Sequence, residues 1–332
     1  MKSYQRLLIF GLAVLALTAF VSPWAAMAWS QFTRVYPAWN RIEVDFSRIF
    51  DRIFIVSGVV LFFVCRRLLK ISLTELGVTP AKSGWRDAAL GSAISLASMA
   101  VLVLLMSLTG SFDPFFRLSP GETLRRCANA LAAAVTVAFI EEIFFRGIIF
   151  KGLREDLPAV WAYLFASLFF SAIHFVQPAN DIALSAVGPG AGLRHASESF
   201  HRFLDPAPIL PGLLGLFLIA VVLCYAFERT GRLYMSMGLH AGWIFGLKSF
   251  GAFGRYTREG LGWMFGSTDP KVVSGVISWI GIIAAGVAVH WVTRRCKRAT
   301  SVIPPRGFKR NRLFHHEVHE ACPEQHRRDH EV

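Results

Sequence analysis

Long apolar stretches separated by short polar turns dominate the pattern of the chain. A helix needs about 20 apolar residues to cross the hydrocarbon core of a bilayer, and most of these stretches approach that length. The pattern therefore predicts an all-α fold, a polytopic membrane helical bundle of about eight transmembrane helices. The expected spans cover residues 7–29, 53–69, 88–108, 120–154, 161–175, 209–227, 233–250 and 272–292.

The polar segments define the organisation around these spans. Residues 1–292 are expected to form a single integral membrane domain, and residues 293–332 a basic, Pro-containing tail without fixed structure. The longest segment between spans, residues 177–208, has a loop-like composition with Gly and Pro at 188–190. Its polar side chains at His195, Glu198 and His201 are expected on the surface.

Composition agrees with a membrane protein and argues against nucleic acid as a partner. The 332 residues are 54% hydrophobic and carry a formal net charge of +13. The basic residues lie in short clusters at span ends and in the tail, as membrane orientation requires, so no nucleic-acid partner is expected. The five cysteines show no CxxC spacing, which indicates neither a disulfide framework nor a zinc site.

Lys and Arg also bear on topology. Both termini are expected in the cytoplasm, and the tail decides this orientation because it alone holds 10 of the 35 Lys and Arg residues. The first apolar run is long enough to remain as an anchor. The alternative of a cleaved signal peptide stays open, because Ala26, Met27 and Ala28 resemble a signal-peptidase site.

Two adjacent carboxylates and a guanidinium interrupt the fourth predicted span. Ionisable groups at membrane depth are costly unless they are paired or hydrated, so they indicate function. Glu142 and Arg146 are four residues apart on one helix face, which allows a supporting charge-assisted bond. Glu141 points about 100° away from that pair, since successive residues turn by this angle, and is free for a separate, reactive role.

Two histidines lie in later spans, His174 in the fifth and His240 in the seventh. The midpoint between Glu141 and His174 falls in the turn at residues 155–158, so antiparallel neighbouring helices place these two side chains at similar depth. A poorly solvated carboxylate is suited to take a proton from water. Glu141 with His174 can therefore activate a water molecule, and His240 can hydrogen-bond to a developing oxyanion.

These residues resemble the three motifs of the CPBP family. The motifs are Glu-Glu-x-x-x-Arg at 141–146, Phe-x-x-x-His at Phe170 and His174, and a later intramembrane His at His240; their core covers about residues 120–250. The family contains CAAX prenyl-protein endopeptidases and bacteriocin-processing or immunity proteins. The resemblance implies a glutamic intramembrane endopeptidase in which Glu141 and His174 activate the water and His240 stabilises the oxyanion, with no catalytic metal and no other cofactor.

The expected partners follow from this reading. The substrate is a membrane-anchored or lipid-modified protein or peptide, cut at a peptide bond within a wet cavity between the fourth to seventh spans, and the lipid bilayer is the other partner. The resemblance implies a multi-pass protein of the bacterial inner (plasma) membrane. Neither the cleavage site nor a need for prenylation follows from the sequence.

One departure keeps other functions open. The family commonly has Asn four residues after the third-motif His, and this chain has Ile244 there. Losing an oxyanion donor typically costs about 100- to 1000-fold in rate. A non-catalytic CPBP-fold protein acting in immunity or peptide binding is therefore one alternative. A metal-dependent membrane protease using Glu141, Glu142, His174 and His240 is another, whereas a proton-coupled transporter lacks the expected repeated halves.

Overall fold

The fold is helical, with one short two-stranded sheet. The computed structural model describes residues 3–41, 44–68, 72–78, 81–178, 181–257, 261–266 and 272–294. The predicted tail, residues 293–332, lies outside the described residues from position 295 onward. The all-α prediction is confirmed.

Each predicted span coincides with a long helix. These helices are α1 (Ser3–Val35), α2 (Phe46–Leu68), α3 (Ala81–Leu108), α4 (Pro120–Glu142), α6 (Ala159–Ile173), α8 (Leu210–Thr230), α9 (Tyr234–Phe250) and α11 (Val276–Thr293). The shorter elements are β1 (Phe112–Pro114), π-helix η2 (Ile143–Phe150), α5 (Lys151–Asp156), α7 (Ala191–Glu198), β2 (Gly254–Tyr256) and α10 (Gly262–Phe265), with 3₁₀ turns at Pro37–Arg41, Leu184–Ala186 and His201–Leu204.

Four of the described helices are long and apolar enough to cross a membrane by length and composition. They are Leu8–Val35, Gly84–Leu108, Leu210–Thr230 and Val276–Thr293, in α1, α3, α8 and α11. Helix α6 is apolar but has only 15 residues. The chain is therefore an integral membrane protein, and the crossing of the bilayer by the remaining helices stays a prediction.

The contacts of the chain define two compact units. One unit comprises Met1–Ser72 with Ala172–Leu210, and the other Leu73–Ser171 with Pro211–Val332. Below they are called the small unit and the main unit. The expectation of a single membrane domain over residues 1–292 stays a prediction.

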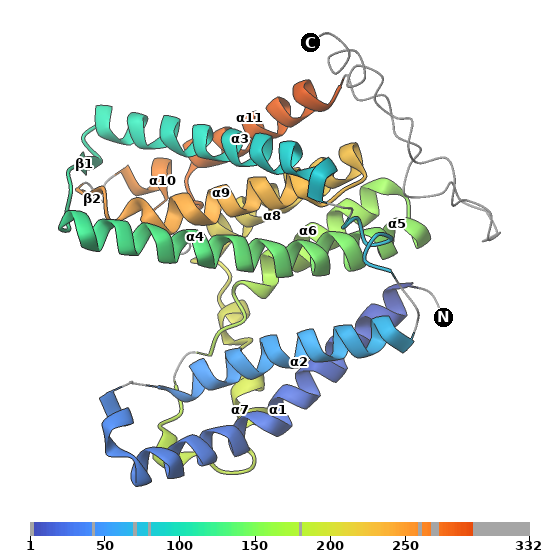
Figure 1. Ribbon diagram of the computed structural model, residues 1–332, viewed down its shortest axis with the longest axis vertical. Helices are drawn as coiled ribbons and strands as arrows, with labels where there is room; N and C mark the ends of the chain where they lie inside the picture. Colours follow the sequence, from blue (N-terminus) through green and yellow to red (C-terminus); the bar gives the residue numbers. More distant parts are fainter. Residues whose placement is uncertain are drawn as a thin grey trace. The chain divides into compact units, whose positions relative to one another are not determined.

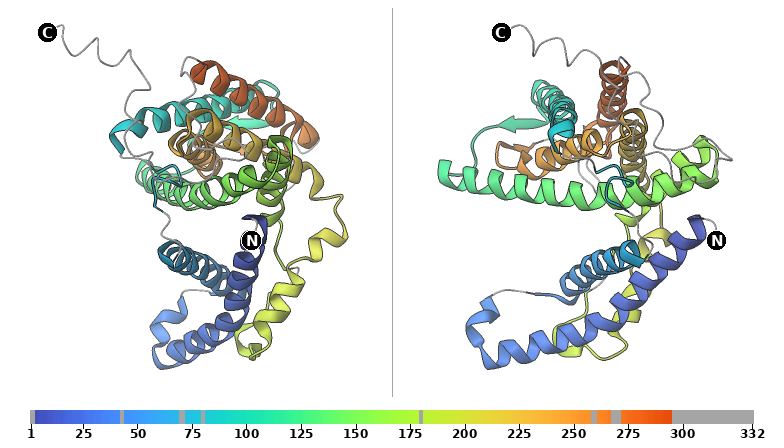
Figure 2. Two further views of the ribbon diagram at one scale, coloured as in Figure 1. Left: turned by 90° about the vertical axis from the view of Figure 1, so that its right-hand side faces the viewer. Right: turned by 45° about the vertical axis from the view of Figure 1, so that its right-hand side comes forward.

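The small unit is built on helix α1, which packs against α2 and α7 (Figure 2). Its apolar cluster includes Phe46 and Phe50 of α2. The prediction that residues 177–208 are loop-like is wrong in part, because α7 forms there and packs on α1. His195 of α7 is also not a surface residue: only 1% of it is exposed, because its ring lies against Phe46 and Phe50 with centroid separations of 5.3 and 4.5 Å.

The main unit is organised around helix α9, which makes its most extensive contacts with α3 and α4 (Figure 1). Strands β1 and β2 pair antiparallel, with Phe112 opposite Tyr256 and Pro114 opposite Gly254. This pairing connects the segment after α3 to the segment after α9. The two helices are therefore tied at one end as well as along their length.

A row of small residues explains how closely α3 and α9 approach. A Cβ atom on Gly238 would lie 2.0 Å from the Ala88 carbonyl oxygen, and one on Gly242 would lie 2.0 Å from the Ser95 hydroxyl oxygen. Glycines four residues apart allow helix backbones to pack at this distance in membranes. His240 lies between these glycines in sequence, so it projects from the opposite side of α9, away from α3.

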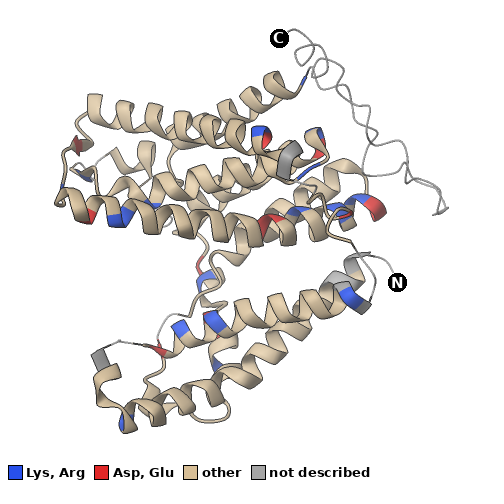
Figure 3. Cartoon of the chain, viewed as in Figure 1, with Lys and Arg blue, Asp and Glu red and all other residues tan. Residues whose placement is uncertain are grey.

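Helix α4 begins where the sequence predicts. The Ser119 side chain accepts a bond from the Glu122 amide, and the Glu122 carboxylate accepts from the Ser119 amide, a complete capping box with Pro120 in the first turn. Figure 3 shows that charged residues are sparse along the helices and more frequent near their ends. The charges at the junction of α4 with η2, part-way along the combined helical segment, therefore stand out against an apolar bundle.

The glycine contact yields a test of the α3–α9 packing. We expect Gly238→Ala to lower the free energy of unfolding by about 1–3 kcal/mol, because its new methyl group meets a backbone oxygen that has little freedom to move. Thermal unfolding in detergent micelles measures this. Gly281→Ala in α11 is the matched control, since its Cβ would meet nothing within 4 Å. Equal stability of the two variants would contradict the proposed packing.

Candidate functional site

The site begins where helix α4 changes its geometry. The α-helix ends at Glu142, and a π-helix, in which each bond spans five residues, follows over Ile143–Phe150. Its wider turn packs on a neighbouring segment, because a Cβ on Gly147 would lie 3.0 Å from the Leu76 carbonyl oxygen. π-Helical turns inside longer helices are frequent at functional sites. The sequence analysis predicted a continuous helix and missed this segment.

Glu142 and Arg146 form a fully buried ion pair. The Arg146 Nη1 donates to Glu142 Oε1 at 2.7 Å, and the exposed fractions of the two side chains are 1% and 0%. The Arg146 guanidinium also lies over the ring of Phe170 in α6, 4.5 Å from its centroid. A charge pair in such surroundings is stable only while both partners are present.

His240 of α9 joins the same carboxylate. Its Nδ1 lies 2.8 Å from Glu142 Oε1, and its ring packs edge-on against Phe170 with centroids 5.8 Å apart. A carboxylate only accepts hydrogen bonds, so Nδ1 carries the proton in this contact. The tautomer of His240 is thus fixed by Glu142, and Nε2 is directed elsewhere.

Nε2 of His240 is directed toward Glu141. The distance from Nε2 to Glu141 Oε2 is 3.8 Å, which is too long for a direct hydrogen bond and is a spacing that a bridging water can serve. The Glu141 side chain is 28% exposed, in contrast to the closed environment of Glu142. The two adjacent glutamates therefore differ as the sequence analysis expected. Glu142 forms a buried ion pair, and Glu141 is partly exposed and outside that pair.

His174 lies directly after the end of α6, in a turn. It falls in the small unit, whereas Glu141, Glu142, Arg146 and His240 belong to the main unit. The facing of Glu141 and His174 therefore stays a prediction.

Two further residues of α9 matter for the site. Ile244 is half-buried one turn beyond His240. Trp243 is buried and donates from its indole nitrogen to the Ser98 hydroxyl oxygen of α3 at 3.0 Å. This bond helps to fix the rotation of α9, and hence the direction of His240. The sequence analysis missed it, since a Trp in an apolar span carries no signal that identifies a partner on another helix.

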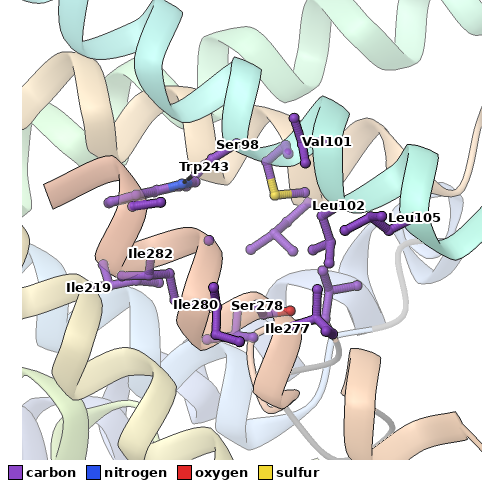
Figure 4. A pocket seen from close by; sticks show the side chains of 16 residues that line it. Ser98, Val101, Leu102, Leu105, Ile219, Trp243, Ile277, Ser278, Ile280 and Ile282 are labelled. Carbon is purple, nitrogen blue, oxygen red and sulfur yellow. Dashed lines mark hydrogen bonds between the residues drawn. The ribbon is translucent and has the colours of Figure 1, made fainter. Parts of the chain in front are cut away.

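Trp243 also lines an apolar cavity of about 200 Å³ (Figure 4). Its walls come from α3, α8, α9 and α11, and include Leu102, Leu105, Ile219 and Ile280. Hydrocarbon dominates this lining, so the cavity is suited to apolar groups rather than to acid–base chemistry.

The described residues also bear on the metal alternative. No group of three or more His, Cys, Asp and Glu side chains among them is arranged to hold a metal ion. The proposed ligand set of Glu141, Glu142, His174 and His240 stays a prediction, because His174 belongs to the small unit and the other three to the main unit. A chelation experiment below addresses it directly.

Two carboxylates, an imidazole and a guanidinium thus lie together on packed helices of a helical membrane protein. A comparison with protein families gives the class to which this part of the chain is similar: residues 123–246 match the family model of the type II CAAX prenyl endopeptidases, Rce1-like. The chain therefore carries a domain of this CAAX-protease family, as the motif resemblance predicted. No curated protein and no solved structure matches the chain.

The contribution of the buried ion pair to the free energy of unfolding can be tested. We expect Arg146→Met to cost about 3–5 kcal/mol of unfolding free energy, because it leaves the Glu142 carboxylate without its cation in a closed site. Arg194→Met is the matched control: Arg194 and Glu198 are also four residues apart and bonded at 2.8 Å, but are exposed. Their loss should leave the melting temperature unchanged, as for most surface pairs. Similar melting temperatures for both variants would show that the buried pair stabilises the protein no more than the exposed pair does.

Proposed function

We propose that the protein is an intramembrane endopeptidase that hydrolyses a peptide bond of a membrane-anchored or lipid-modified protein with a water activated by Glu141 and His174. The observation that carries the proposal is the division of the two glutamates. The Glu142 carboxylate is bonded to both Arg146 and His240, whereas the Glu141 side chain is partly exposed and lies beside His240. The Rce1-like match supports a CAAX-type protease as the class.

In the proposed reaction, Glu141 takes a proton from a water molecule as the oxygen of that water attacks the carbonyl carbon of the substrate. The carbonyl electrons move onto its oxygen and form a tetrahedral oxyanion. When the C–N bond breaks, the proton held by Glu141 passes to the departing amine. His174 is assigned the second contact to the water, which orients its lone pair.

His240 is assigned the stabilisation of the oxyanion, and Glu142 explains how it does so. Because Nδ1 donates to Glu142, His240 can donate to an oxyanion only through Nε2, as the doubly protonated imidazolium. The buried Glu142 carboxylate stabilises that cation. This gives His240 a donor role that does not depend on the Asn that Ile244 replaces.

The same geometry favours a second mechanism for the same function. A neutral His240 with its proton on Nδ1 presents a bare Nε2, which makes the Glu142–His240 pair similar to the carboxylate–histidine part of a hydrolase triad. In that case His240 is the base, and Glu141 binds the water from the other side. The first mechanism requires Glu141 as the base, whereas in the second Glu141 only binds the water.

Removal of the proposed base is the first test of the function. We expect Glu141→Gln to reduce cleavage by at least about 100-fold with unchanged folding, because an amide cannot take the proton. Comparative proteomics of membrane-protein termini, with and without the active protein, reads out cleavage and names the substrate. Glu155→Gln, at an exposed position near the end of the same helical segment, is the control. Unchanged turnover in Glu141→Gln rejects this mechanism and favours His240 as the base.

The role of His174 needs a separate test. We expect His174→Ala to abolish cleavage while the protein still folds and inserts. A non-catalytic protein that acts in immunity or peptide binding would instead keep its biological activity in the Glu141→Ala, His174→Ala double variant. That outcome favours binding over chemistry and contradicts the proposal.

Chelation distinguishes the metal-dependent alternative. Since the proposed reaction uses only carboxylate and imidazole groups, we expect turnover to be unchanged after incubation with a strong zinc chelator and dialysis. A loss of activity that is restored by added Zn²⁺ would show that a metal takes part.

A further inference from the structure

Behind the Glu142–Arg146 pair, several buried polar atoms lack a partner. Among the described residues, no hydrogen bond reaches Arg146 Nε, Arg146 Nη2, Glu142 Oε2 or the Ser167 hydroxyl oxygen. The three residues that carry them, Glu142, Arg146 and Ser167, are fully buried. An unpaired buried polar group costs about 1–3 kcal/mol, and more where it is charged.

These atoms gather in one place. The thiol of Cys224 in α8 lies close to both Arg146 and Ser167. Phe170 closes one face of the guanidinium. The unpaired atoms therefore lie close together where the π-helix, α6 and α8 meet. We call this group, Glu142, Arg146, Ser167 and Cys224, the rear pocket.

Nearby protein groups do not satisfy these atoms. Ser236 is close to Glu142, but its hydroxyl donates to the Leu233 carbonyl oxygen at 2.9 Å. The Cys224 sulfur is a weak acceptor, so it does not replace a full hydrogen bond to a guanidinium. The set combines charged donors on Arg146 with an acceptor on Glu142.

We propose that the rear pocket binds ordered water, which holds the Glu142 carboxylate in place against His240. Water both donates and accepts, so it can link Arg146 to Glu142 Oε2 and to Ser167, which is the usual role of buried water in proteins. An anion is less suitable, because the Glu142 carboxylate would repel it. This inference rests on the proposed function only for its effect on cleavage, since Glu142 contacts His240, which lies near Glu141.

The native Cys224 thiol reports on hydration of the rear pocket without any substrate. In a variant whose other four cysteines are replaced by Ala, infrared spectroscopy can follow the S–H stretch after transfer into D₂O. We expect Cys224 to become S–D at least about 100-fold faster than a thiol in a dry part of the same helix. Leu223→Cys in a Cys224→Ala background provides that dry control, because Leu223 is an apolar core residue with an exposed fraction of 0%. Equally slow exchange of both thiols would overturn the water site.

A matched pair of variants at Ser167 tests the positioning of Glu142. Val and Thr have nearly the same shape, so Ser167→Val and Ser167→Thr differ only in a methyl group that takes the place of the hydroxyl. We expect Ser167→Val to lower cleavage by about 10-fold, which is 1.4 kcal/mol in the barrier, and Ser167→Thr to restore most of it. Fast thiol exchange with equal cleavage in both variants would overturn the positioning role.

The proposed function can fail independently of the rear pocket. Full cleavage by Glu141→Gln would reject the proposed base, whereas the thiol exchange is measured in the resting protein and is unaffected by that result.

Discussion

The buried carboxylate of Glu142 is the constraint on which the rest of the site depends. One of its oxygens receives bonds from Arg146 and from His240, and so ties α4, the π-helix and α9 together at 2.7 and 2.8 Å. An unpaired buried charge would cost too much free energy in an apolar bundle, so Glu142 must be buried together with its partners Arg146 and His240. The carboxylate thereby sets the tautomer of His240 and leaves Glu141 as the accessible acid–base group.

The sequence was sufficient to predict the helices and much of the charged cluster. Apolar stretches of about span length identified each long helix, and the span predicted from residue 120 begins where α4 begins. The four-residue spacing of Glu142 and Arg146 predicted their ion pair because it is a local contact of one helix turn. The family domain likewise followed from short motifs whose order is visible in the chain.

Features that depend on contacts between distant segments could not be predicted from the sequence. The π-helix, the pairing of β1 with β2 and the burial of His195 between Phe46 and Phe50 have no local signature. The bond from His240 to Glu142 was missed for the same reason. The sequence analysis assigned His240 a bond to the oxyanion, but it could not show that Nδ1 would be engaged by the glutamate not assigned to catalysis.

The state of the His240 ring tests the account most directly. Nitrogen-15 NMR of the histidine-labelled protein, with the signal assigned by its loss in His240→Gln, reports which ring nitrogen carries a proton. The account predicts a protonated, hydrogen-bonded Nδ1 whose signal shifts in Glu142→Gln. A bare Nδ1, or a signal that is unchanged when Glu142 is replaced, would contradict the central role of Glu142.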